Sequence, residues 1–203
     1  DTANDKIVGM ELWNKDDTFR RYYYCINYPE GYYPGDGKTY YDEALTRKWK
    51  TGASGSEDNH DLNWGNRNIY RLAVLATAKT RPAIYDALKA RRFYSTLDKT
   101  LNLSFTVNGA PMGSTITPGN CYVAIKASDN WTESLGYYNE TPEPFTQIDL
   151  LKNGVVIKSW PLSNVTNPYV TCNVSCASGD YLYVRVKQLD GGEAISSPVF
   201  INY

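Results

Sequence analysis

The chain has 203 residues, with 21 basic and 22 acidic side chains and a formal net charge of −1. This charge creates no broad positive field, which argues against nucleic acid and anionic membranes as partners. No apolar run approaches the ~20 residues of a membrane-spanning helix, so we expect a soluble protein of one or two domains, and prefer two. The chain begins without methionine, on DTANDK, and we expect a processed or truncated product.

The first hundred residues mix predicted strands and helices. The apolar runs at 6–14 and 71–77 predict two buried strands. The prolines and glycines of residues 15–40 predict a long loop, and residues 41–49 a short helix. Residues 80–96 carry apolar side chains at helical spacing and give the clearest helix prediction in the chain.

From Leu101 onward the pattern changes. Short segments of alternating apolar and polar residues lie between turn signals, such as the Asn-Gly pairs at 108–109 and 153–154. Strands at this spacing, with no helix among them, predict an immunoglobulin-like β-sandwich of roughly 100 residues. We therefore expect one domain at 1–99 and a β-sandwich domain at 100–203.

The four cysteines, Cys25, Cys121, Cys172 and Cys176, lack the C-x-x-C spacing of a structural zinc site. If residues 169–176 form a strand, the Cα atoms of Cys172 and Cys176 lie about 13 Å apart, beyond disulfide reach. Either of them could pair with Cys121 on a neighbouring strand, or the buried thiols could be free.

The single histidine of the chain, His60, follows Asp58 in the run TGASGSEDNH at 51–60. In an extended segment the two side chains point the same way and can share a divalent metal. Two other interpretations remain open. One is a loop histidine hydrogen-bonded to a neighbouring acid, and the other is a Ser-His-Asp site using Ser54 or Ser56, although neither serine lies in a G-x-S-x-G turn.

The order of these segments resembles the carboxy-terminal half of metal-dependent phosphoesterases of the polymerase and histidinol phosphatase (PHP) superfamily. It is most similar to the extracytoplasmic CehA/McbA-like branch, which carries a C-terminal β-sandwich. The resemblance covers essentially the whole chain and is most specific in the glycine, serine and D-x-H string followed by NWG, and in RPAIYDALKARRFYST followed by NGAPMGS. It implies an α/β part at 1–99, formed by a partial, distorted PHP-like β/α barrel, and a periplasmic or secreted location.

The resemblance also implies site residues. Asp58 and His60 look like metal ligands at the carboxyl end of a strand, and Glu11 matches an x-E-x-x-N element, where it is either a ligand or structural. Arg71 is a candidate for binding a substrate phosphate, although such arginines are more often solvated or packed on aromatic rings. No residue of the chain is assigned a catalytic role.

Family members carry an H-x-H pair and further histidines that this chain lacks. Two or three ligands cannot build a multimetal cluster, so we expect an incomplete catalyst. The complete parent would bind Zn, Mn or Fe and a small phosphorylated substrate. This chain alone would contribute part of the metal site, and it would either bind a metal ion there or bind none. Its expected partner is the missing N-terminal half of the barrel or a second copy of itself.

A competing interpretation belongs to another class of protein. The sandwich or the tyrosine-rich loop could make the chain a non-catalytic module that binds a glycan or a protein. An inactive member of the phosphoesterase family is a third interpretation.

Overall fold

The computed structural model describes residues 6–13, 39–57, 59–60, 62, 64–65, 70–130, 133–135, 138–140 and 142–203. Its elements, in chain order, are β1 (Gly9–Trp13), α1 (Tyr40–Thr46), β2 (Gly52–Gly55), β3 (Arg71–Val74), α2 (Arg81–Lys89), β4 (Phe93–Thr96), β5 (Asn102–Val107), β6 (Ala110–Pro111), β7 (Thr115–Ile116), β8 (Gly119–Ser128), β9 (Glu133–Leu135), β10 (Tyr138–Glu140), β11 (Phe145–Lys152), β12 (Val155–Val165), β13 (Tyr169–Cys176), β14 (Tyr181–Gln188), β15 (Glu193–Ser196) and β16 (Val199–Ile201). No helix among these residues is long and apolar enough to cross a membrane.

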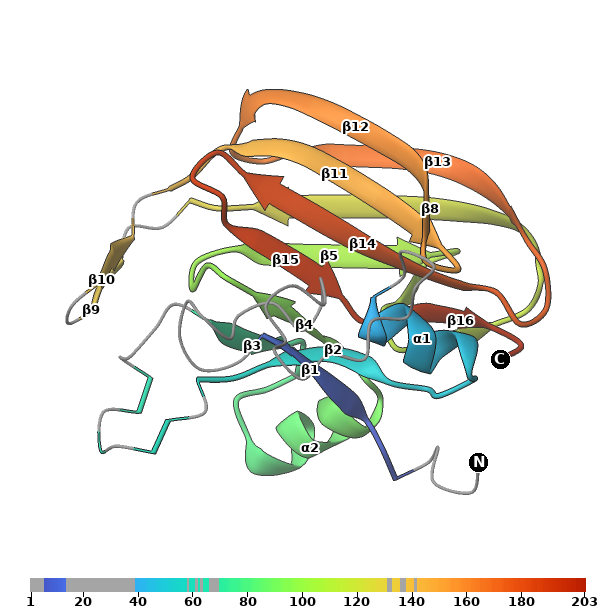
Figure 1. The fold of residues 1–203 in the computed structure, drawn as a ribbon, viewed down its shortest axis with the longest axis horizontal. Coiled ribbons are helices and arrows are strands. Elements are labelled where there is room, and N and C mark those ends of the chain that lie inside the picture. The colour runs from blue at the N-terminus through green and yellow to red at the C-terminus, as the bar shows by residue number, and fades with distance from the viewer. Residues whose placement is uncertain are drawn as a thin grey trace.

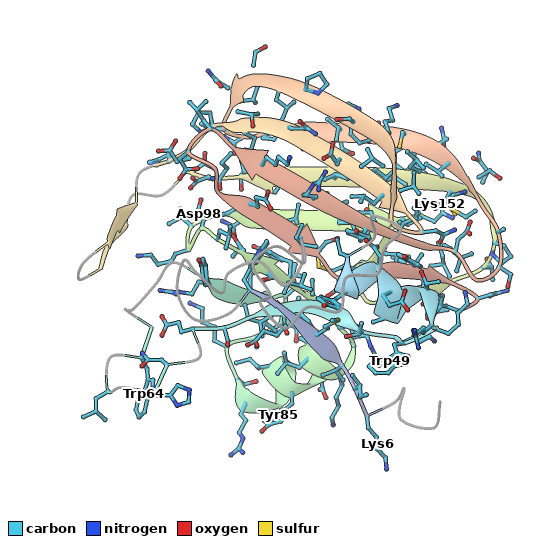
Figure 2. The ribbon with its side chains drawn as sticks, viewed as in Figure 1. Lys6, Trp49, Trp64, Tyr85, Asp98 and Lys152 are labelled. Atoms are coloured by element: carbon cyan, nitrogen blue, oxygen red, sulfur yellow. The ribbon has the colours of Figure 1, made fainter. Side chains whose placement is uncertain are left out.

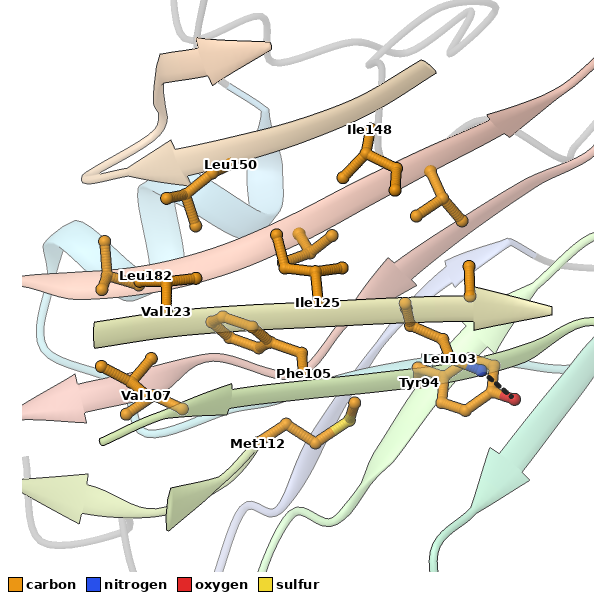
Figure 3. Packing of buried hydrophobic residues seen from close by; sticks show 14 of the residues in the cluster. Tyr94, Leu103, Phe105, Val107, Met112, Val123, Ile125, Ile148, Leu150 and Leu182 are labelled. Atoms are coloured by element: carbon orange, nitrogen blue, oxygen red, sulfur yellow. Dashed lines mark hydrogen bonds between the residues drawn. The ribbon is translucent and has the colours of Figure 1, made fainter. Parts of the chain in front are cut away.

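Two sheets pack face to face over one hydrophobic core (Figure 1). The larger sheet has the order β12-β11-β14-β15-β4-β3, with β16 paired to β14 and β7 paired to β16. The smaller sheet has the order β13-β8-β5-β6. Along β5 the side chains alternate, so that Leu103, Phe105 and Val107 are buried while Asn102 and Ser104 are exposed. Figure 3 shows the three apolar residues packing toward the facing sheet. The predicted alternating strands are therefore confirmed, and the fold is rich in β-sheet.

The larger sheet continues across the predicted domain boundary. β4 pairs antiparallel with β15, and β3 pairs antiparallel with β4, although both β3 and β4 precede residue 99. The Tyr94 hydroxyl donates to the Leu101 carbonyl at 2.7 Å and accepts from the Leu103 amide at 3.2 Å. The division at 99/100 stays a prediction, but its two sides share one sheet and one core.

The predicted helix at 80–96 is wrong in its second half. α2 begins after Thr80, whose hydroxyl caps the Ala83 amide, and ends at Lys89. Arg91 then adopts a left-handed conformation with φ of 57°, and its guanidinium donates to two carbonyls of the N-terminal segment. Residues 93–96 are buried along their whole length, and burial on both faces within a sheet overrides the local helical pattern.

β1 and β2 form a two-stranded parallel sheet that lies against the larger sheet. In the described part of the chain this pair does not close into a barrel. A Cβ atom at Gly52 would lie 2.7 Å from the Phe93 ring, so glycine is required for β2 to approach β4 this closely. A second core cluster joins this layer to the sandwich; it contains Leu12, Trp13, Tyr41, Leu45, Ala53, Tyr70, Leu151, Tyr181, Tyr183, Ile195 and Phe200.

The carboxylate of Asp42 in α1 is the polar centre of that cluster, and the residue is only 2% exposed. It accepts hydrogen bonds from the hydroxyls of Tyr183 at 3.1 Å, Tyr181 at 3.2 Å and Thr39 at 2.8 Å. Burial raises the pKa of Asp42, and the hydrogen bonds only partly offset this effect. Both tyrosines belong to β14, so this contact attaches α1 to the sandwich.

We expect Asp42→Ala to lower the free energy of unfolding by about 2–4 kcal/mol, because two buried tyrosine hydroxyls lose their acceptor. Urea unfolding followed by circular dichroism measures this loss. The matched control is Asp86→Ala on the exposed side of α2. Equal, small losses in the two variants would contradict the anchoring role.

A second buried carboxylate, Asp149 of β11, joins three strands. It accepts from Arg185 of β14 at 2.7 Å, from Ser159 of β12 at 2.7 Å and from Gln147 at 2.6 Å. Burial raises the pKa of Asp149, but the hydrogen bonds and the charge of Arg185 outweigh burial and hold the pKa below its usual value of 3.8.

Because the pKa of Asp149 is lower in the folded state, its carboxylate contributes stability that is complete above about pH 4 and is lost as the pH falls through the folded-state value. We therefore expect Asp149→Asn to cost more free energy of unfolding at pH 7 than at pH 3. Urea unfolding of both proteins at the two pH values measures the difference. A larger cost at pH 3 would show that the ion pair does not stabilise the fold.

Candidate functional site

The carboxyl ends of β1 and β2 lie side by side because the two strands are parallel. Glu11 pairs in register with Ser54, and the Ser56 amide donates to the Trp13 carbonyl at 3.0 Å. The Ser56 hydroxyl donates to Glu11 Oε1 at 2.5 Å. The start of the 56–60 segment and the Glu11 carboxylate therefore meet at one edge of this sheet.

Glu57 organises the segment that follows. Its Oε1 lies 3.3 Å from Arg71, and its Oε2 accepts from the Gly65 amide at 2.9 Å and from Asn59 at 3.3 Å. Arg71 also donates to the carbonyls of Tyr70 at 2.7 Å and Gly65 at 2.6 Å. The Glu57 and Arg71 side chains are 12% and 26% exposed. This network links the end of β2 to the start of β3.

The structure locates three of the four residues predicted for the site. Glu11 contacts Ser56, Arg71 contacts Glu57, and His60 is exposed. Asp58 lies outside the described residues, so its pairing with His60 stays a prediction. Among the residues that the structure describes, no group of three or more His, Cys, Asp or Glu side chains is placed to hold a metal ion.

Sequence reasoning assigned no role to Glu57, which lies between Ser56 and Asp58. Its partner Arg71 lies 14 positions further along the chain. No local spacing indicates that contact. The available signal was an acidic residue after one buried strand and a basic residue opening the next.

The described cysteines are poor candidates for a nucleophile. Cys121, Cys172 and Cys176 are free thiols, and Cys172 and Cys176 lie on one strand, β13, as predicted. Burial, followed by the contact with Cys121, raises the pKa of Cys176 to about 12, and burial also raises the pKa of Cys172. Nucleophilic cysteines have lowered pKa values. Cys25 lies outside the described residues.

A groove of about 400 Å³ lies elsewhere, between the edge of β3 and the strands β5 and β8. Lys126 is the charged residue of its lining, which otherwise consists of small, apolar and hydroxyl side chains with Tyr94 and Asn102. This lining contains no carboxylate or imidazole, so it does not match a hydrolytic metal site.

Comparison with known proteins identifies two similar curated sequences. An uncharacterized protein of Chlamydia pneumoniae is 26% identical over 152 residues, and one of Chlamydia muridarum (strain MoPn / Nigg) is 25% identical over 142 residues. Each match covers 64% of this chain and 22% of the relative, so the chain spans about a fifth of the length of the curated relatives it matches. No family model matches the chain. No solved structure matches it either.

We expect Arg71→Met to lower the free energy of unfolding by about 1–3 kcal/mol, because it removes hydrogen bonds from a charged donor to Glu57 and to two carbonyls. The matched control is Arg81→Met, since Arg81 is exposed and lies over the Tyr85 ring. Urea unfolding compares the two variants. If Arg71→Met costs no more than Arg81→Met, the contacts of Arg71 are weak, and its guanidinium is available for a substrate phosphate.

Proposed function

We propose that this chain is the C-terminal portion of a metal-dependent hydrolase in which Asp58 and His60 supply part of a metal site. The observation that carries the proposal is the parallel pairing of β1 with the buried strand β2, which leads directly into the 56–60 segment. Ligands of α/β folds bind at the carboxyl ends of parallel strands. The contact of Glu11 with Ser56 adds a carboxylate at the same edge.

The resemblance to PHP phosphoesterases supports a phosphate ester as the substrate and an extracytoplasmic location. It also supports the finer fold assignment, in which residues 1–99 belong to a distorted β/α barrel and residues 100–203 to an immunoglobulin-like sandwich. Both assignments belong to the proposal.

Exposed apolar side chains support the view that the N-terminal layer is incomplete. Trp64 is 72% exposed and Tyr85 is 49% exposed, and Figure 2 shows both projecting away from the sandwich. Ala87 is the fully buried residue of α2, whereas Ile84 is exposed. Residues outside the chain, in the form of the N-terminal half of the barrel or a second copy, would cover this surface.

The donor set fits part of a metal site. Asp58 and His60 provide one carboxylate and one imidazole, and a catalytic zinc needs about three protein ligands, so the others would come from outside the chain. When bound, the metal would supply a hydroxide nucleophile and stabilise developing charge. Asp58 and His60 would hold the ion and would not transfer protons. The Glu57–Arg71 ion pair would fix the segment that carries them.

This assignment predicts the metal content of the complete parent protein. We expect His60→Ala and Asp58→Asn each to weaken metal affinity by at least about tenfold, because each removes a ligand. Plasma mass spectrometry after dialysis measures the bound metal, with Asp86→Asn on α2 as the matched control. Unchanged metal content in both ligand variants would refute the assignment.

The isolated 203-residue chain provides a second test. We expect no more than trace hydrolysis of a generic phosphomonoester with added Mn²⁺ or Zn²⁺, since the ligand set is incomplete. Turnover by the chain alone that His60→Ala abolishes would show that the site is complete, which contradicts this expectation and keeps the hydrolase assignment.

A binding module is the alternative function, and one observation favours it. Tyr122 of β8 and Tyr169 of β13 are 46% and 62% exposed and hydrogen-bond to each other on the outer face of the smaller sheet. Paired exposed aromatic rings can stack on a sugar or pack against a protein. Specific glycan or protein binding that Tyr122→Ala and Tyr169→Ala abolish, in a parent without metal, would favour this function.

A further inference from the structure

Three of the four cysteines lie on two paired strands of the smaller sheet. Cys121 belongs to β8, and Cys172 and Cys176 belong to β13, which forms an edge of this sheet in the described part of the chain. Cys121 pairs in register with Val174, midway between the two cysteines of β13. Since alternate residues of a strand share a face, both of these cysteines are diagonal neighbours of Cys121 on the face that covers the core. The register alone does not decide which of them Cys121 faces.

The directions of the side chains decide between them. The Cys121 thiol donates to the Gly119 carbonyl at 3.8 Å, and Gly119 pairs in register with Cys176. The Cys176 thiol donates to the Val174 carbonyl at 3.7 Å, and Val174 pairs in register with Cys121. Each thiol therefore leans along its own strand toward the other, and the two side chains are in contact. Cys172 lies on the far side of Val174, so Cys121 leans away from it.

A bond between these two sulfurs requires a small movement at the end of β13. Diagonal neighbours on antiparallel strands have Cα atoms roughly 7–8 Å apart, whereas a disulfide needs about 6.8 Å or less. Closing the bond therefore draws Cys176 toward β8 by about 1 Å. Gly119, opposite Cys176, has no side chain, and a Cβ atom there would meet nothing within 4 Å. Cys176 is also the last residue of β13, which pairs with one strand in the described sheet, so few contacts oppose the movement.

We propose that Cys121 and Cys176 form a disulfide bond when the chain folds in the presence of a small-molecule disulfide such as oxidised glutathione. One of the two thiolates attacks a sulfur of oxidised glutathione, its S–S bond breaks, and one glutathione leaves as a thiolate. The other protein thiolate then attacks the protein sulfur of the mixed disulfide and releases the second glutathione. Two protein thiols are oxidised, one glutathione disulfide is reduced to two thiols, and two protons pass from the protein thiols to the released thiolates. The pair is separate from the proposed hydrolytic site.

Burial determines when the bond forms. Cys121 is fully buried and Cys176 is 4% exposed, so a reagent has little access to either sulfur in the folded chain. Burial, followed by the contact with Cys121, raises the pKa of Cys176 to about 12, so the attacking thiolate is also scarce. Oxidation therefore takes place during folding, before the two sheets close over the thiols. Once formed, the bond is protected from reductants in the same way.

The bond fastens the edge of the smaller sheet. It joins β13 to β8 and closes a loop from residue 121 to residue 176, which contains β11 and β12 of the larger sheet. A disulfide that closes a long loop restricts the unfolded chain more than one that closes a short loop. We therefore expect the oxidised chain to have a Tm about 5–10 °C above that of the reduced chain.

Mapping of the free thiols tests the pair directly. Every protein in the test carries Cys25→Ala, so that the three cysteines of β8 and β13 remain. The chain is refolded from urea in a mixture of oxidised and reduced glutathione, its free thiols are alkylated with iodoacetamide in urea, and mass spectrometry of peptides identifies the alkylated residues. We expect alkylation at Cys172 alone. Alkylation of all three cysteines, a disulfide between two chains, or a bond from Cys121 to Cys172 would overturn the proposal.

Matched variants connect the bond with the rise in Tm. Cys172→Ala keeps both partners, so it should lose both of its free thiols on refolding and keep the higher Tm relative to dithiothreitol. Cys121→Ala and Cys176→Ala should each keep two free thiols and show equal Tm in the two buffers. Free thiols or an unchanged Tm in Cys172→Ala would overturn the proposal, and so would a rise of equal size in Cys176→Ala. If Cys121→Ala does not fold, Cys176→Ala removes the same bond and still decides.

Discussion

The contact between Asp42 and the tyrosines of β14 determines how the two parts of this molecule are joined. The Asp42 carboxylate is buried, so its hydrogen-bond donors must come from within the protein. Tyr181 and Tyr183 supply hydroxyls from alternate positions of one strand, and their rings lie 6.3 Å apart in stacked orientation. β14 therefore contributes one face to the sandwich core and the other to the N-terminal layer. The pairing of β14 with β11 and β15 therefore lies inside the protein, because both faces of β14 are covered.

The C-terminal half could be predicted because its pattern is local. β5 and β13 alternate between apolar and polar residues over their whole length, and the turns between strands carry their own sequence signals. β4 could not be predicted in the same way. Its residues follow a good helix without a break, and the partner that makes them a strand, β15, lies about a hundred residues further along the chain. Long-range pairing of this kind leaves no trace in local spacing.

The candidate site shows the same division between local and long-range information. The D-x-H string indicated where chemistry could occur, but only the resemblance placed a strand before it. The ion pair of Glu57 with Arg71 was not readable from the sequence, because it depends on how β2 and β3 lie against each other. Contacts that hold candidate site residues in place form only in the folded structure, so they have to be located there. The candidate residues themselves can be located in the sequence.

Buried carboxylates in this chain are stabilised in three different ways. Asp149 has a guanidinium and remains charged, with its pKa lowered. Asp42 has hydroxyl donors, each with a proton directed to it, and its pKa is raised by burial. Asp98 and Asp129 share the Thr100 hydroxyl and the Gln188 amide as donors, and the backbone amides of Thr100 and Glu143 donate to them as well. Asp129 therefore has amide and hydroxyl donors but lacks the guanidinium that Asp149 has, which is consistent with the raised pKa of Asp129 and the lowered pKa of Asp149.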